Sequence, residues 1–141
     1  MTEQMNQMPT TFGYEIIRDH VLSSVLGKHE ADILYWAGKE LARKFPAFEV
    51  EELPTFFKEA GWGPLTLQKK SKKEVIYHLH IDPNIAEANQ RAYQLEAGFI
   101  AEQYQNIQQY LTECYAKVKS KEAIVELTIA WDPKEIIEKE G

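Results

Sequence analysis

Hydrophobic positions in the first part of the chain recur every three or four residues, which is the spacing of one face of an α-helix. This pattern covers residues 14–26, where Gly27 follows as a stop signal, and residues 31–45, where Pro46 cannot continue the helix. A shorter stretch over residues 51–60 repeats it. The first part of the chain is therefore predicted to contain three helices.

The spacing changes to every second residue in the centre of the chain, which predicts β-strands. Apolar and polar side chains alternate over residues 65–68 and again over residues 75–81. Residues 71–73 form a short polar turn between them, so the two strands are predicted to pair as an antiparallel hairpin. The stretch from 85 to 95 fits a helix and a short strand equally well.

Apolar residues then recur at alternating intervals of four and three across residues 96–119, which predicts one long amphipathic helix. The odd positions of residues 123–131 give an almost unbroken apolar face, so this segment is predicted to be a strand that Asp132 and Pro133 end. The apolar faces of the long helix and the last strand are expected to meet in the core.

These elements predict the α+β class, with an antiparallel β-sheet and helices packed on one face. Residues 12–133 are expected to form one domain, without internal repeats or linkers. The polar residues 1–11 are expected to be a mobile start, and residues 134–141 a charged tail with at most one frayed helical turn.

Composition and charge narrow the class of protein. The chain has 141 residues, 44% of them hydrophobic and 27% charged, which is typical of one globular domain. Its net charge of −6 opposes a polyanionic partner, and the four lysines between Lys69 and Lys73 are interpreted as a solvated hairpin tip. No nucleic-acid partner is therefore predicted.

The sequence is predicted to carry no signal for export or for membrane insertion. Its start has neither a basic region nor an apolar run, and no apolar stretch approaches the ~20 residues that span a bilayer. Cys114 is the single cysteine, which excludes an intrachain disulfide. A cytoplasmic protein without membrane insertion is predicted.

Few side chains offer chemistry. His78 and His80 project from one face of a predicted strand, but structural zinc takes four ligands, so no metal site is predicted. Glu96 and Glu102 lie near opposite faces of a helix and cannot share an acid–base centre; Glu96 is expected at the positive helix end, and Glu102 toward solvent or a partner. Cys114 is expected to be a buried small hydrophobe. Without a nucleophile elbow or a phosphate loop, the chain is predicted not to be an enzyme and to use no cofactor.

Three stretches, in this order, resemble the 4-vinyl reductase domain, a relative of the TRAPP transport-particle subunits. Residues 33–41 resemble its helix with a small Ala-Gly pair, residues 61–67 its glycine-bracketed approach to the hairpin, and residues 95–103 the small-Gly-aromatic start of its long helix. The last stretch also resembles the YslB-type proteins of Bacillus and related bacteria. Together with the hairpin and the final strand, the resemblance covers residues 33 to 131.

The resemblance implies a TRAPP-like architecture and two functions. The first hypothesis is a small hydrophobic ligand held in the domain core, and the second is a homodimer that pairs through the first two helices as an interaction or scaffold protein. Large aromatic residues are the candidate ligand contacts: Trp36, Phe57, Trp62, Phe99, Tyr104 and Trp131.

Four glycines are interpreted as structural: Gly38, Gly61, Gly63 and Gly98. Glycine inside a helix costs about 1 kcal/mol relative to alanine, so Gly38 and Gly98 are expected to allow close backbone approach. For Gly98, the approach is expected to be that of the long helix to the sheet.

Overall fold

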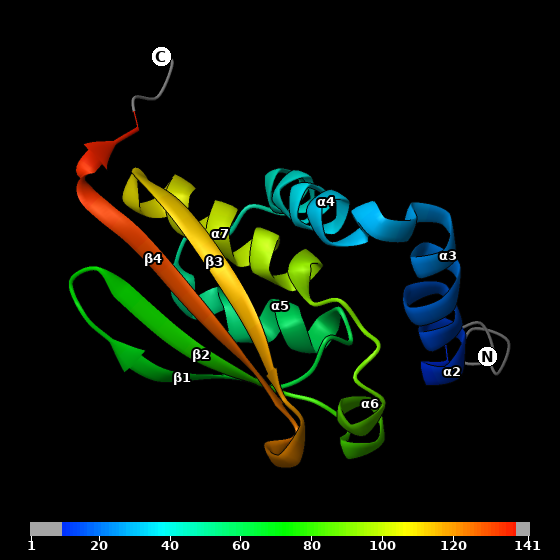
Figure 1. Cartoon of the computed structure of the whole chain (residues 1–141). Helices are drawn as coiled ribbons and strands as arrows, with labels where there is room; N and C mark the ends of the chain where they lie inside the picture. Colours follow the sequence, from blue (N-terminus) through cyan, green and yellow to red (C-terminus); the bar gives the residue numbers. More distant parts are fainter. Residues whose placement is uncertain (1–9, 138–141) are drawn as a thin grey trace, which may run out of the picture.

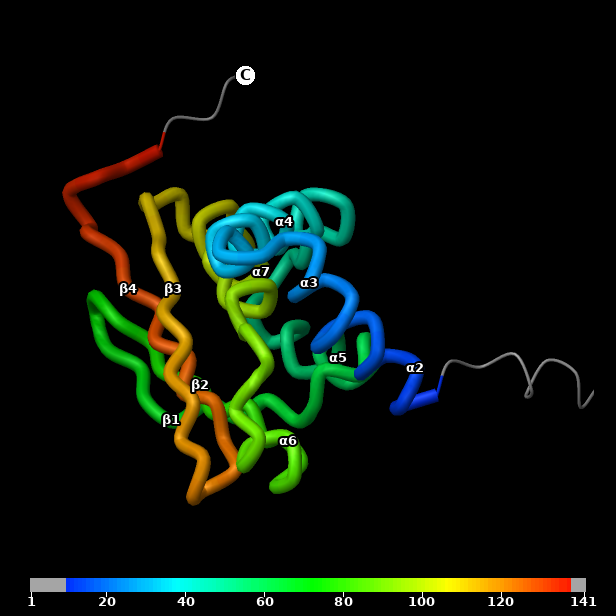
Figure 2. Tube along the Cα trace, turned by 45° about the vertical axis from the view of Figure 1, so that its right-hand side comes forward, coloured from blue at the N-terminus to red at the C-terminus, as the bar shows by residue number. Residues whose placement is uncertain are grey.

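A computed structural model describes residues 10–137 of the chain (Figure 1). Four antiparallel strands form one sheet, and the helices pack on one of its faces, which confirms the predicted α+β class. Figure 2 shows this arrangement with the strands on one side and the helices on the other. The expected properties of residues 1–9 and 138–141 lie outside the described residues.

The sheet has the strand order β1-β2-β4-β3, so that β4 lies between two strands that are far apart in sequence. The predicted hairpin is confirmed, because β1 pairs antiparallel with β2. A register shift between Leu67 and Lys69 places a bulge in β1 at one edge of the sheet. The strands are β1 (Leu65–Lys70), β2 (Glu74–His80), β3 (Tyr110–Lys119) and β4 (Ile124–Ile136).

The two faces of the sheet differ in polarity, as the alternating pattern predicts. Val75, Tyr77 and Leu79 of β2 point toward the helices and are buried. On the opposite face, His78 of β2 lies beside Glu126 of β4, with 3.5 Å between His78 Nε2 and Glu126 Oε2. One face of the sheet is therefore core and the other is polar.

The helical layer begins with an N-terminal arm, α2 (Thr11–Glu15), a π-helical segment η1 (Ile16–Val21) and α3 (Leu22–Leu26). In Figures 1 and 2 this arm stands on the side of the molecule away from the strands. Gly27 ends it with a φ of 57°, so the predicted stop is confirmed. The other helices are η2 (Gly27–His29), α4 (Glu30–Lys44), η3 (Val50–Glu52), α5 (Leu53–Glu59), α6 (Pro83–Ala88), α7 (Gln94–Gln108) and η4 (Ser120–Glu122).

The single long helix predicted over residues 96–119 is wrong. Helix α7 ends at Gln108, and strand β3 begins at Tyr110. Gln109 makes the break in the left-handed conformation, with a φ of 66°, and its N–H donates to Gln105 O at 2.8 Å. Left-handed helix ends usually carry glycine, so a glutamine in this place gives little signal in the sequence.

The predicted end of the last strand at Asp132 and Pro133 is also wrong, because β4 continues to Ile136. Strand β2 pairs with β4 only as far as Ala130, whereas β3 pairs with it as far as Ile136. Beyond Trp131, β4 is therefore bonded on one side only, which is a setting where a strand tolerates proline. Of the undecided stretch 85–95, the residues up to Ala88 belong to α6 and those from Gln94 belong to α7, whereas residues 89–93 join the two helices without forming a strand. The helical interpretation is therefore confirmed for the two ends of the stretch.

Helix α7 lies between α4 and the sheet, and its residues from Glu96 to Tyr104 are all buried. Gly98 faces α4 and not the sheet, which corrects the expected partner. A Cβ atom on Gly98 would collide with the backbone of Tyr35, and one on Gly38 would collide with the carbonyl oxygen of Leu95. The two glycines therefore let the backbones of α4 and α7 touch.

Candidate functional site

An aromatic cluster fills the space between α5, α7 and the segment that joins α5 to β1. Phe56 stacks on Phe99 with ring centroids 4.4 Å apart, and Trp62 contacts Phe99 edge-on at 5.4 Å. Phe57 packs edge-on against Trp62 at 4.9 Å. Such edge-on and offset arrangements are the favoured geometries of aromatic pairs. Three of the predicted ligand contacts are therefore brought together, but they pack on one another.

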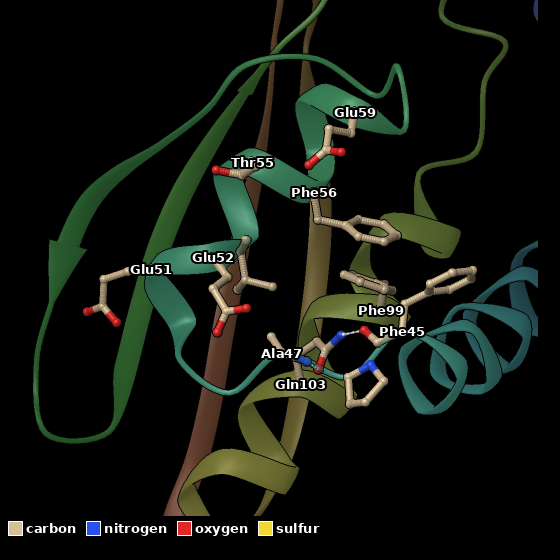
Figure 3. Close-up of a pocket in the computed structure, with 11 residues that line it drawn as sticks. Phe45, Ala47, Glu51, Glu52, Thr55, Phe56, Glu59, Phe99 and Gln103 are labelled. Carbon is tan, nitrogen blue, oxygen red and sulfur yellow. Dashed lines mark hydrogen bonds between the residues drawn. The ribbon is translucent and has the colours of Figure 1, made fainter.

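A cleft of about 440 Å³ opens beside this cluster (Figure 3). Phe45 and Phe56, whose ring centroids lie 5.9 Å apart, form its apolar wall together with Phe99. Glu59 of α5 stands at its rim, whereas Glu51 of η3 also lines the cleft but turns its side chain away from Phe45 and Phe56 in Figure 3. The cleft thus joins an aromatic wall to one carboxylate at its rim.

Gln103 of α7 fixes the loop that closes one end of this cleft. Its Nε2 donates to Phe45 O at 2.8 Å, and its Oε1 accepts from Ala47 N–H at 3.0 Å, as Figure 3 shows. Gln103 is almost fully buried, so both bonds are protected from water. We infer that the wall at Phe45 is held in place and does not depend on a ligand for its position.

The six predicted ligand contacts do not surround one cavity. Phe57 and Trp62 are packed in the core, and Phe99 reaches the cleft. Tyr104 stacks on Trp131 at 6.2 Å, on a different part of α7. Trp36 lies apart on α4 with 61% of its surface exposed. Phe45 and Phe56 complete the cleft wall; the apolar stripe of the third helix pointed to Phe56, but nothing in the sequence marked Phe45 as its neighbour.

The glycines at the approach to the hairpin have a conformational role. Gly61, just after α5, has a φ of 75°, and Gly63 has a φ of 124°. A Cβ on Gly63 would lie 2.6 Å from His80 O, so a side chain there would meet the backbone of β2. Both positions favour glycine because L side chains rarely adopt positive φ.

A buried ion pair joins the N-terminal arm to the domain. Arg18 Nη2 donates to Glu96 Oε1 at 2.5 Å, and the two side chains are 2% and 1% exposed. Burial opposes the charge on Arg18, but attraction to the Glu96 carboxylate outweighs it and raises the pKa of Arg18. Next to this pair, Arg91 Nε and Nη2 donate to the two carboxylate oxygens of Asp19 at 2.7 and 2.8 Å.

Ion pairs change the interpretation of both glutamates of α7. Glu96 does stand in the first turn of the helix, as predicted, but it also holds Arg18. Glu102 is 5% exposed and accepts from Arg43 Nε at 3.1 Å, so its expected position toward solvent is wrong. Glu102 is buried because α4 covers this face of α7, and the spacing of apolar residues in α7 did not indicate that a second helix packs there.

The outer side of the arm and of α4 is rich in exposed apolar side chains. Seven of the thirteen large apolar residues exposed within the described chain lie between residues 12 and 36. Val25 is 75% exposed and Ile17 is 52% exposed. The full set is Phe12, Ile16, Ile17, Val21, Val25, Ile33 and Trp36.

Other candidate groups have ordinary partners. His80 Nε2 lies 3.1 Å from Thr66 Oγ1, and no group of three or more His, Cys, Asp or Glu side chains within residues 10–137 could hold a metal ion. Cys114 is buried on β3, as expected for its side chain although not for its element, and burial raises the pKa of its thiol. None of the described helices has the length and apolar character needed to cross a bilayer.

Two side chains reach the outer edge of β3. Cys114 N–H donates to the Tyr35 hydroxyl at 3.2 Å, and Thr112 N–H donates to Gln105 Oε1 at 3.2 Å. Because β3 is an edge strand, these main-chain groups have no neighbouring strand on that side. Side chains of α4 and α7 take the place of one.

Comparison with known proteins agrees with this fold. A family model described as "Protein of unknown function (DUF2507)" matches residues 11–130. The chain belongs to the DUF2507 family. A relative in Bacillus subtilis (strain 168), described as "Uncharacterized protein YslB", is 44% identical over 127 residues, which cover 88% of this chain and 86% of the relative. The predicted kinship with YslB-type proteins is thereby confirmed.

Solved structures extend the likeness of this DUF2507 chain. A vinyl-4-reductase family protein from Methanocaldococcus jannaschii superposes with a TM-score of 0.60 at 15% identity, covering 92% of this chain and 87% of that one. A trafficking protein particle complex subunit 3 from Naegleria fowleri, covalently bound to palmitic acid, gives a TM-score of 0.47 at 10% identity, covering 98% and 90%. At these identities, the first match supports the 4-vinyl reductase type of fold and nothing further.

Proposed function

We propose that this protein is a non-enzymatic, cytoplasmic interaction module that forms a homodimer through its N-terminal arm and α4. The observation that carries the proposal is the concentration of exposed apolar side chains on these helices, where seven large residues are 38–75% exposed. Extended exposed apolar surface on a folded domain usually marks an interaction site.

The arm is suited to binding because its inner side is already anchored. Arg18 forms an ion pair with Glu96, and Asp19 forms one with Arg91, so the arm is held in one position before a partner binds. A preorganised surface loses less conformational entropy on association. The apolar side therefore presents a nearly fixed shape.

A second copy of the same chain is the partner that this surface fits. Between residues 11 and 26 the charged residues are Glu15, Arg18 and Asp19, and the last two are turned inward in ion pairs. Two arms related by a twofold axis would therefore meet with little like-charge repulsion. Dimers with twofold symmetry are the commonest soluble oligomers, and their interfaces are self-complementary.

Light scattering of the purified chain at tens of micromolar tests the dimer. The expected mass is twice that of the chain, and Val25→Lys and Ile17→Lys are expected to shift it toward the monomer, because each places a charge in the interface of both copies. Leu111→Lys is the matched control, since Leu111 is 49% exposed but lies on β3. A monomeric wild type, or a Val25→Lys variant that dimerises as well as Leu111→Lys, would refute the proposal.

A second candidate function is the binding of a small hydrophobic ligand, in the cleft of Figure 3 and not in a hollow core. A volume of about 440 Å³ lies within the ~300–1,000 Å³ of typical ligand sites. The wall of Phe45 and Phe56 suits an aliphatic or aromatic group, and the carboxylate of Glu59 suits a positively charged end. An amphiphilic amine combines both features.

Titration with a primary alkylamine and with the alcohol of equal length tests this candidate. The amine is expected to bind more tightly, and Phe56→Ala is expected to weaken both ligands, whereas Phe48→Ala is the control because Phe48 is 87% exposed and outside the cleft. Glu59→Gln should reduce the preference for the amine. Equal binding of amine by wild type and Phe56→Ala would remove the cleft as the site.

A further inference from the structure

A second, smaller cavity of about 240 Å³ lies where the hairpin meets the C-terminal end of α7. Its walls come from η3, α5, β1, β2 and α7. Tyr77 and Tyr104, which are 4% and 3% exposed, supply its polar wall, and Pro54 and Leu67 supply apolar wall. It shares Glu51 alone with the lining of the cleft of Figure 3, whose aromatic wall is formed by Phe45 and Phe56.

The two tyrosines leave one hydroxyl proton free. Their hydroxyl oxygens are 2.5 Å apart, so one phenol donates to the other. Each phenol has a single O–H to donate, so a pair that shares one hydrogen bond retains one donor. Within the described residues no acceptor takes that second proton. Burial raises the pKa of both tyrosines, which keeps both protons in place at neutral pH.

Gln108 offers an acceptor in the same cavity. It lines the cavity next to Tyr104, one turn further along α7, and its Oε1 is buried without a hydrogen-bond partner within residues 10–137. A buried polar atom that is left unpaired costs stability, so unpaired groups in a folded protein call for an explanation. The cavity thus presents one free donor and one free acceptor.

Size and charge limit what can enter. A cavity of about 150 Å³ in another protein binds benzene, so 240 Å³ accommodates one substituted six-membered ring. Glu51 and Lys70 both line the cavity, so a ligand of either charge would meet one side chain of like charge. The apolar walls at Pro54 and Leu67 suit the ring itself.

We propose that this cavity binds a small neutral ring that carries a carboxamide, whose carbonyl oxygen accepts the free proton of the Tyr77–Tyr104 pair while its N–H donates to Gln108 Oε1. A carboxamide matches the site because it carries an acceptor and a donor on one planar group. The proposal goes beyond homodimerisation and does not depend on it, because none of the cavity walls belongs to the N-terminal arm or α4.

An NMR titration of the full chain with benzamide tests the proposal, with α-methylstyrene as an apolar probe of nearly the same shape. Benzamide is expected to shift the amide signals of Tyr77, Tyr104 and Gln108 saturably. The double variant Tyr77→Phe/Tyr104→Phe removes the donor; benzamide binding should weaken roughly tenfold, as for one lost hydrogen bond, and α-methylstyrene binding should change less than about twofold. A single variant is insufficient, because the remaining tyrosine keeps its proton.

A filled-cavity variant covers the case in which the double variant does not fold. Leu67 is 55% exposed, so Leu67→Trp should fold and yet occupy the cavity, which would abolish binding of both probes. Leu111→Trp, at 49% exposure outside the cavity, should bind both as the wild type does. Absence of saturable shifts with benzamide, full affinity in the double variant, or full affinity in Leu67→Trp would each overturn the proposal.

Discussion

The contact between α4 and α7 makes Gly98→Ala the most informative single change. In an unobstructed helix, alanine in place of glycine stabilises by about 1 kcal/mol. Here the three nearest atoms to an added Cβ all belong to the backbone of Tyr35, with the carbonyl carbon at 2.9 Å and Cα at 3.1 Å. Backbone cannot rotate away as a side chain can, so α4 itself must move.

The size of the effect follows from that displacement. The carbonyl oxygen of Tyr35 is the nearest of the three atoms, and relieving its contact with the Cβ requires the helices to separate by about 1 Å or more. A gap of roughly 1 Å forfeits about half of the dispersion energy of each contact along the pair. Overpacking of this kind costs about 1–3 kcal/mol and sometimes more. Because the collision is with backbone, we expect a net destabilisation of about 2 kcal/mol, or a melting temperature lower by roughly 5–10 °C.

Thermal unfolding followed by circular dichroism, at one fixed protein concentration, measures this change. Gly13→Ala is the matched control, because Gly13 is also helical and an added Cβ would meet only the Thr10 side-chain oxygen, at 3.1 Å. We expect it to change the free energy of unfolding by less than about 1 kcal/mol. A Gly98→Ala variant that melts at or above the wild-type temperature would show that close approach is not the reason for this glycine.

Three further predictions concern buried polar groups. Arg18→Met should lower the free energy of unfolding by about 3–5 kcal/mol in urea titrations because it leaves the Glu96 charge unpaired, and Glu96→Leu added to it should restore most of the loss; no recovery would contradict this. Burial raises the pKa of Tyr35 and Tyr93 to about 12, so stability should fall as pH rises from about 10 to 12, where the unfolded chain releases protons that the folded chain keeps. A urea midpoint that stays constant over that range would refute it. The Cys114 thiol should react with a disulfide reagent only after denaturation, and rapid labelling of the native protein would be the opposite result.

The helices before residue 60 and the central hairpin could be predicted because each has one buried face, whose period is visible in the sequence. Strand β3 could not, because Leu111, Cys114 and Val118 continue the four-and-three spacing of α7 by coincidence. The break at Gln109 requires a positive φ, which residues other than glycine adopt only when the surrounding structure holds them there.

Ion pairs between residues far apart in the sequence could not be predicted from the sequence either. Arg18 and Glu96 are 78 positions apart, and only the folded topology brings the arm onto the start of α7. The candidate ligand contacts could be recognised as aromatic core, but their division between the packed cluster, the cleft and the Tyr77–Tyr104 pair depends on packing that periodicity does not encode.

Both margins of the sheet are partly blocked against main-chain association. On one margin, the bulge after Leu67 and the lysines at 69 and 70 disturb β1, and on the other, the side chains of Gln105 and Tyr35 take two amide groups of β3. Exposed strand margins are the usual starting points of fibril growth and of peptide capture by strand addition. The fold should therefore resist amyloid formation at high concentration. A peptide that binds by adding a fifth strand to the sheet is the least suitable kind of partner for this protein.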